Sequence, residues 1–198
     1  MTVSKSWAMV IVGYSVLAAA MLAFLTVNGV SSTAFGTIGT AGLLGLGLVL
    51  PVVGMQELAR RIDPSKGGTR TGLTLQSPCL IGILIGLLLS FFASSLPGHM
   101  ASATFIALSG ISGLVGAILI SNELGARQLV LGAVLLAIGA ALIPASNIGS
   151  QMYWVQDLEK NVYQDIGATV AACGCVLAAY SCFVIRKCSG PSIARWSG

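Results

Sequence analysis

Few side chains in this sequence could bind a small molecule, and most of them are uncharged. Gln76, Asn147 and Tyr180 can form hydrogen bonds, and Glu57 supplies a carboxylate near the end of a long apolar run. Amides and phenols can replace part of a solute's hydration shell without placing a charge in a low-dielectric interior. These four residues are therefore the candidate solute pathway.

Two of the four residues also have simpler interpretations. Glu57 can pair with Arg60 or Arg61, one helical turn away on the same surface. Asn147 follows an apolar run and can serve as the residue that finishes a helix. Both alternatives remain open at the level of sequence.

The residue types that perform catalysis or bind metals are sparse. The single histidine, His99, lies beside Pro97-Gly98, and no serine–carboxylate set can be assembled around it. The spacing Cys173-Gly-Cys175 is not that of a metal site. We therefore expect no enzyme activity, no metal and no cofactor. The five cysteines lie in or beside apolar runs: Cys79, Cys173, Cys175, Cys182 and Cys188.

Cys188 directly follows Arg186-Lys187, at the predicted end of the last apolar run. A cysteine beside a membrane-spanning segment is a typical site of palmitoylation. An unmodified thiol is the alternative.

The composition is that of a membrane protein. Of 198 residues, 56% are hydrophobic and only 8% are charged, with a mean hydropathy of +0.93, whereas a soluble domain carries about 25% charged residues. Lipid must therefore surround most of the chain. The net charge of +4 comes from scattered basic residues, which gives no footprint for a nucleic acid.

Turn residues divide the sequence into six apolar runs, which predict an all-α polytopic protein with a single transmembrane domain over residues 1–198. Pro78 is expected in the first turn of the third helix, and Pro97-Gly98 is expected to end it. The stretches 56–76 and 145–164 are expected to be connections. The predicted helices span residues 7–27, 34–55, 78–96, 102–120, 129–144 and 166–185.

The basic residues predict how the six helices are oriented. Placing the N-terminus and the C-terminus in the cytoplasm leaves only Lys160 of the ten basic residues outside, beside the aromatic residues Tyr153, Trp154 and Tyr163. This asymmetry follows the positive-inside rule. The nine residues assigned to the cytoplasmic side are Lys5, Arg60, Arg61, Lys66, Arg70, Arg127, Arg186, Lys187 and Arg195.

Glycines recur about every three residues in the second and fourth apolar runs. The starts of the two runs are also similar, Ser32-Thr-Ala-Phe35 and Ser102-Ala-Thr-Phe105. Small residues let membrane helices approach closely, so we expect these glycines to serve helix packing, within the chain or between subunits; a pore lining is the alternative. An internal helical-hairpin repeat is one interpretation, and chance resemblance of apolar helices is the other. The glycines are Gly36, Gly39, Gly42, Gly45, Gly110, Gly113 and Gly116.

Charged residues are absent from the interiors of all six runs. Ionisable groups inside a membrane mark proton relays and ion-coupled sites. The sequence therefore argues against a proton pump and favours a passive mechanism for any transport.

Short motifs resemble the acetate uptake transporters (succinate–acetate permeases). Gly54-Met-Gln-Glu57 is similar to that family's Ala-Gly-x-x-Glu, Ser146-Asn147-Ile-Gly149 to its Gly-Asn-x-x-Gly, and Ala178-Ala-Tyr180 to its Ala-x-Tyr. The order holds over about 43–185. The sequence departs from the family where Gln76-Ser-Pro-Cys-Leu replaces an aromatic Tyr-Gly-x-Phe-Trp. The sequence resembles the urea and amide channels more loosely, in its predicted topology and in Val27-Asn28-Gly29 after the first helix.

The resemblance implies passage of a small monocarboxylate such as acetate, or of a small neutral amide, by a hexamer-like homo-oligomer. A structural or scaffold subunit of a larger membrane complex is the alternative, because helices without polar groups suit it equally well. The expected partners are the lipid bilayer and other copies or membrane subunits. The expected location is the plasma membrane, with an organelle membrane as the alternative.

Overall fold

The computed structural model describes residues 3–29, 34–154 and 156–193. Its described part is helical, and each of the six helices contains a segment long and apolar enough to cross a membrane. The chain is therefore an all-helical, six-span membrane protein. In order, the helices are α1 (Val3–Gly29), α2 (Ala34–Arg61), α3 (Gly67–Phe92), α4 (Leu96–Leu124), α5 (Arg127–Gln151) and α6 (Asp157–Ile193).

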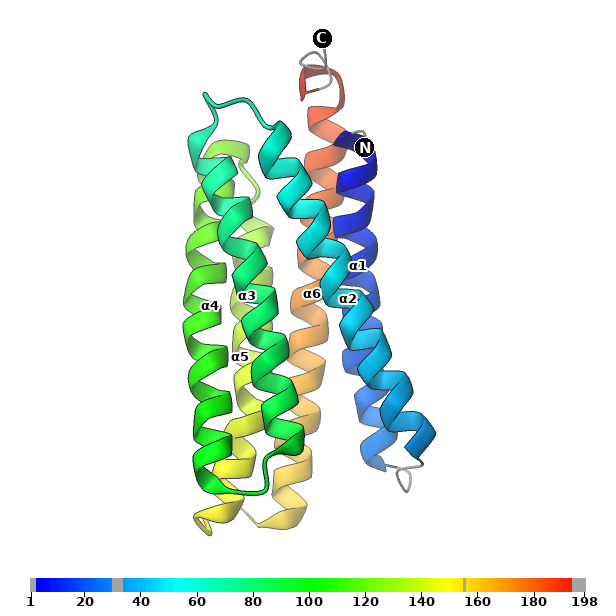
Figure 1. Ribbon diagram of the computed structural model, residues 1–198, viewed down its shortest axis with the longest axis vertical. Coiled ribbons are helices and arrows are strands. Elements are labelled where there is room, and N and C mark those ends of the chain that lie inside the picture. Colours follow the sequence, from blue (N-terminus) through cyan, green and yellow to red (C-terminus); the bar gives the residue numbers. More distant parts are fainter. Residues whose placement is uncertain (1–2, 30–33, 155, 194–198) are drawn as a thin grey trace.

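The helices form a closed ring in which each helix packs against the next and α1 packs against α6. Both termini lie at one end of the bundle, together with the α2–α3 and α4–α5 connections (Figure 1). We call this the termini end and the opposite one the far end. The closest pairs are α1–α2, α3–α4 and α5–α6, whereas α2 leans away from α3 toward the far end (Figure 1).

Glycines allow the helices of all three pairs to approach closely. A side chain at Gly13 would run into the ring of Pro51, and one at Gly47 would meet the backbone of Leu17, so α1 and α2 touch through their backbones. In the α5–α6 pair, Gly139 lies against the carbonyl of Gly167 in the same way. Because lipid offers no hydrophobic drive for helix association, such close packing supplies much of the attraction.

Three of the seven glycines singled out from the sequence lie at helix contacts. Gly113 faces the Sγ of Cys79, Gly116 faces the carbonyl of Gly72, and Gly110 faces Ala137 of α5. The glycines in the first half of α2 differ, because a Cβ atom on Gly39, Gly42 or Gly45 would meet nothing within 4 Å among the described residues. The surroundings of Gly36 lie outside the described residues. The two predicted stripes therefore occupy different environments, and the hairpin repeat stays a prediction.

Helix α3 begins at Gly67, eleven residues before the predicted start at residue 78. Most of the stretch 56–76 is thus helical, and the connection between α2 and α3 covers only residues 62–66. The reason is a partner distant in sequence. Glu123, at the end of α4, accepts hydrogen bonds from the backbone N–H groups of Gly68 (2.8 Å) and Thr69 (2.7 Å). A carboxylate at this position satisfies the free N–H groups of a helix start.

Two other prolines also differ from their expected positions. Pro97 lies in the first turn of α4, where its missing N–H costs nothing, rather than closing the preceding helix. Pro144 lies inside α5, which continues to Gln151 and therefore contains Asn147. At the other end of α4, Gly125 adopts a left-handed conformation (φ 68°) that ends the helix and permits the very short connection to α5.

Candidate functional site

Gln76 lies at the centre of the bundle and joins three helices. Its Nε2 donates a hydrogen bond of 2.7 Å to the carbonyl of Gly113 on α4, and its Oε1 accepts a long one of 3.5 Å from the Tyr14 hydroxyl on α1. Both Gln76 and Tyr14 are buried. The pair is the first of two interior positions at which side chains of different helices hydrogen-bond to one another.

The second polar position is centred on Asn147, near the far end. The Nδ2 of Asn147 donates to the Ser90 hydroxyl of α3 at 3.0 Å, and its Oδ1 accepts from Gln164 Nε2 of α6 at 2.9 Å. Asn147 is buried and connects α3, α5 and α6, rather than ending a helix as one reading of the sequence expected.

Apolar side chains separate the two polar positions. Gln76 and Ser90 are fourteen residues apart on α3, which corresponds to about 21 Å along the helix axis. Ile83 and Leu87 lie between them on the same helix and are completely enclosed. The side chains of Gln76 and Ser90 are thus separated by apolar ones on α3, and the hydroxyl of Ser102 on α4 donates to the Gly86 carbonyl between them.

The other two predicted pathway residues lie elsewhere. Tyr180 is 54% exposed on the outer surface of α6, with no inward contact to Gln76 or Asn147 among the described hydrogen bonds. Glu57 is bound to Arg61 on its own helix, at 3.1 Å, which is the local pairing that the sequence offered as an alternative. The structure thus brings neither residue to the two interior positions.

Three residues of these interior positions were absent from the sequence prediction: Tyr14, Ser90 and Gln164. Ser90 could have been found, because Thr69, Gln76, Ile83 and Ser90 follow a seven-residue spacing that places them on one face of α3. The same spacing marks Tyr14, between the buried Trp7 and Met21 on α1, and Gln164, seven residues before the buried Ala171 on α6. The spacing indicates a buried face but not the partners, which lie on other helices.

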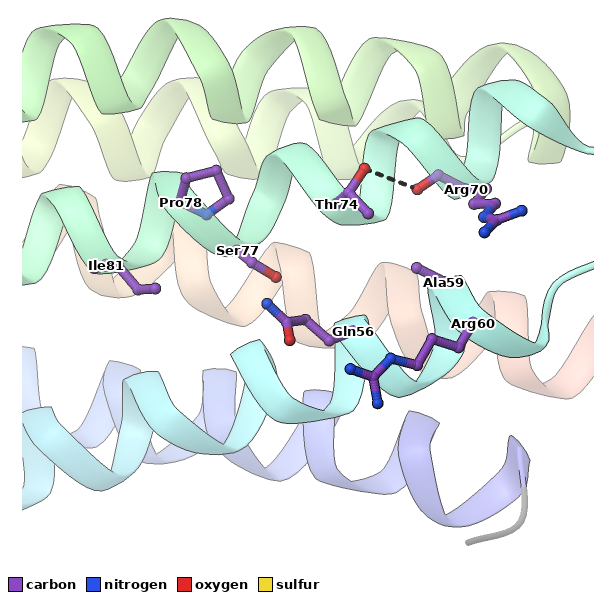
Figure 2. Close-up of a pocket in the computed structure, with 8 residues that line it drawn as sticks. All are labelled: Gln56, Ala59, Arg60, Arg70, Thr74, Ser77, Pro78 and Ile81. Carbon is purple, nitrogen blue, oxygen red and sulfur yellow. Dashed lines mark hydrogen bonds between the residues drawn. The ribbon is translucent and has the colours of Figure 1, made fainter.

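A cleft of about 400 Å³ opens between α2 and α3 near the termini end. We call it the α2–α3 cleft. Figure 2 shows that Gln56 and Ser77 point toward one another across it, while Arg60 and Arg70 lie nearer the α2–α3 connection. The residues that line the cleft are Gln56, Ala59, Arg60, Arg70, Thr74, Ser77, Pro78 and Ile81.

No group of three His, Cys, Asp or Glu side chains that could hold a metal occurs within the described parts of the chain. His99 is buried near the start of α4, and its Nδ1 has no hydrogen-bond partner among the described residues. Cys79, Cys175 and Cys182 are buried thiols, whereas Cys173 faces outward. The side chain of Cys188 lies outside the described residues, so its lipidation stays a prediction.

Comparison with known proteins gave no match: no family model fits the sequence, and no curated protein or solved structure resembles it significantly. The resemblance to acetate uptake transporters therefore rests on the short motifs alone. The class of protein that the fold defines is an integral membrane protein with six helical spans.

Proposed function

We propose that this protein is a passive transporter or channel for a small solute, either a monocarboxylate such as acetate or a small neutral amide. The observation that supports the proposal is the pair of buried polar positions, Tyr14–Gln76 and Ser90–Asn147–Gln164, at two depths of one bundle. Buried hydrogen-bonding groups are costly in a membrane protein unless they stabilise the fold or serve a solute.

The Tyr14–Gln76 pair is the better suited of the two to exchange partners with a solute. At 3.5 Å, its hydrogen bond is at the long limit for an O–H donor, which prefers about 2.7–2.8 Å to its acceptor. A urea or carboxylate group arriving there could accept from the Tyr14 hydroxyl at little cost. The enclosed side chains of Ile83 and Leu87 would then act as the apolar barrier to larger or hydrated molecules.

The proposal is tested by flux into liposomes that contain the purified chain, with acetate, formate and urea as solutes. Tyr14→Phe removes the hydroxyl at the central position, and Tyr180→Phe is the matched control on the outer surface. We expect Tyr14→Phe to lower flux about fivefold, because one neutral hydrogen bond contributes about 1 kcal/mol. Tyr180→Phe should leave flux unchanged. Folded protein that passes none of these solutes would contradict the proposal.

A second candidate function, a structural subunit of a larger membrane complex, is supported by the outer face of α2. Gly39, Gly42 and Gly45 face open space there, beside the exposed side chains of Leu46 and Val49. Bare glycine surfaces are typical of contacts between membrane helices. Extraction in mild detergent separates the candidates: a symmetric assembly of this chain alone favours the transporter, and co-purification with other chains at a fixed ratio favours the subunit.

A further inference from the structure

The mouth of the α2–α3 cleft carries two arginines without a described counter-ion. Arg61 is bound to Glu57, but Arg60 and Arg70 form no ion pair with any described residue. Arg60 comes from the last turn of α2 and Arg70 from the first turn of α3, on either side of the connection between these helices. In Figure 2 the Arg60 side chain extends back along α2 toward Gln56, and Arg70 lies nearer the connection. The described carboxylates at this end of the bundle have other partners: Glu57 pairs with Arg61, Asp63 accepts from the backbone N–H of Ser65, and Glu123 caps α3.

Deeper in the cleft, the hydroxyl of Ser77 is buried and has no partner. Ser77 is 2% exposed, and its Oγ makes no hydrogen bond within the described structure. Hydroxyls elsewhere in the bundle donate to the carbonyl four residues earlier, as Thr104 of α4 does to Met100 and Ser181 of α6 does to Leu177. A buried hydroxyl without a partner costs about 1–3 kcal/mol. Its position on the cleft wall, facing Gln56, indicates that a bound molecule supplies the missing partner (Figure 2).

The cleft becomes apolar beyond the hydroxyl groups. Along α3 the lining changes from Arg70 through Thr74 and Ser77 to Pro78 and Ile81. Arg70 and Ile81 are separated by eleven residues, or about 16 Å along the helix. Pro78 and Ile81 are exposed on the outer surface of the bundle, within the membrane-spanning part of α3. The order of charged, hydroxyl and apolar groups is that of a lipid: headgroup, glycerol backbone and acyl chain.

We propose that the α2–α3 cleft is a binding site for an anionic phospholipid of the leaflet at the termini end. Arg60 and Arg70 bind the phosphate, Ser77 and Gln56 bind oxygens of the glycerol region, and an acyl chain lies along Pro78 and Ile81. The positive-inside rule assigns the termini end to the cytoplasm, where anionic lipids concentrate and basic pockets between helices bind their headgroups. This site is separate from the interior Tyr14–Gln76 pair and does not depend on the proposed transport.

A soluble phosphate or carboxylate would explain only part of the lining. It could bind the two arginines, but it would leave the exposed apolar wall of Pro78 and Ile81 uncovered. A lipid would contact both the arginines and the apolar wall, and it would fill the gap where α2 diverges from α3. Since these two helices contact one another less than the other adjacent pairs do, an occupant of this gap should also stabilise the bundle.

The experiment is native mass spectrometry of the whole chain in detergent, titrated with dioleoylphosphatidylglycerol or dioleoylphosphatidylcholine. We expect preferential binding of phosphatidylglycerol, lost about tenfold or more in the double variant Arg60→Gln/Arg70→Gln, because charge-assisted hydrogen bonds contribute about 1.5–3 kcal/mol each. Arg127→Gln, at the exposed start of α5 and outside the cleft, is the matched control and should bind normally.

Ser77→Ala separates lipid binding from folding. It removes a buried hydroxyl without a partner, so the lipid-free protein should unfold at the same or a higher temperature. Binding of phosphatidylglycerol should nevertheless weaken about fivefold. Equal binding of both lipids, or an equal loss in Arg127→Gln, would overturn the site. Displacement of the lipid by millimolar inorganic phosphate would overturn the assignment to a lipid and leave a soluble anion as the ligand.

Discussion

Glu123 and Glu57 illustrate how similar local sequences acquire different roles. Each is followed by Leu and, within four residues, by an arginine, at the termini end of a helix. Glu57 pairs with Arg61 on its own exposed surface, whereas Glu123 reaches the start of a different helix. Nothing in the sequence around Glu123 indicates this difference, because its partners Gly68 and Thr69 are more than fifty residues away. The role of a capping carboxylate depends on which helix start lies beside it.

This contrast predicts that removing the Glu123 carboxylate lowers the stability of the protein more than removing the Glu57 carboxylate does. Glu123→Ala deletes the acceptor for two backbone N–H groups and for the Thr69 hydroxyl, and should destabilise the protein by about 1–2 kcal/mol. Glu57→Ala should have no measurable effect on stability. Thermal unfolding in detergent measures both. Equal melting temperatures for Glu123→Ala and the unmodified chain would show that α3 does not depend on this cap.

At the scale of helices, the sequence predicts the number, order and approximate centres of all six. Apolar length alone carries that information. The ends are predicted less well, because Pro78, Pro97 and Pro144 were interpreted as boundaries. Pro97 lies in the first turn of α4, and Pro78 and Pro144 lie inside α3 and α5, because membrane helices can continue through a proline. Of the four predicted pathway residues, Gln76 and Asn147 are interior, while Tyr180 and Glu57 are not.

Leucine substitutions should distinguish the glycines of α4, which lie at helix contacts, from those in the first half of α2, which do not. A leucine at Gly113 would collide with Cys79 and force α3 and α4 apart, so Gly113→Leu should abolish monodisperse protein in detergent. A Cβ atom at Gly42 meets nothing within 4 Å among the described residues, so Gly42→Leu should leave the fold intact. Size-exclusion chromatography and thermal unfolding of the two variants make the comparison.

A double variant controls for a general effect of larger side chains. Gly113→Ala should be destabilising alone and partly rescued by Cys79→Ala, which removes the sulfur that the new methyl group would meet. Independent, additive effects would mean that the α3–α4 contact is not formed through these two residues. If Gly42→Leu changes the size of the assembly but not the fold, the α2 face is a contact between chains.

At the scale of the whole molecule, the distribution of basic residues agrees with the arrangement of the helices. The described basic residues other than Lys160 lie near the ends of helices that meet at the termini end, and Lys160 lies at the beginning of α6 at the far end (Figure 1). From the same asymmetry, the positive-inside rule predicts that the α2–α3 cleft lies in the leaflet on the cytoplasmic side. Orientation therefore decides which lipids and which solutes the cleft and the interior can meet.

The orientation predicts which residues an impermeant thiol reagent can reach in intact cells or sealed vesicles of known sidedness. In a background without the five native cysteines, Glu159→Cys at the far end should react from outside. Lys66→Cys, in the connection between α2 and α3, should react only after permeabilisation. Both positions are solvent-exposed in the bundle, so access and not burial controls the reaction. Labelling of both residues in sealed cells would contradict the six-span topology, and the reverse pattern would place the cleft in the outer leaflet, against the positive-inside rule.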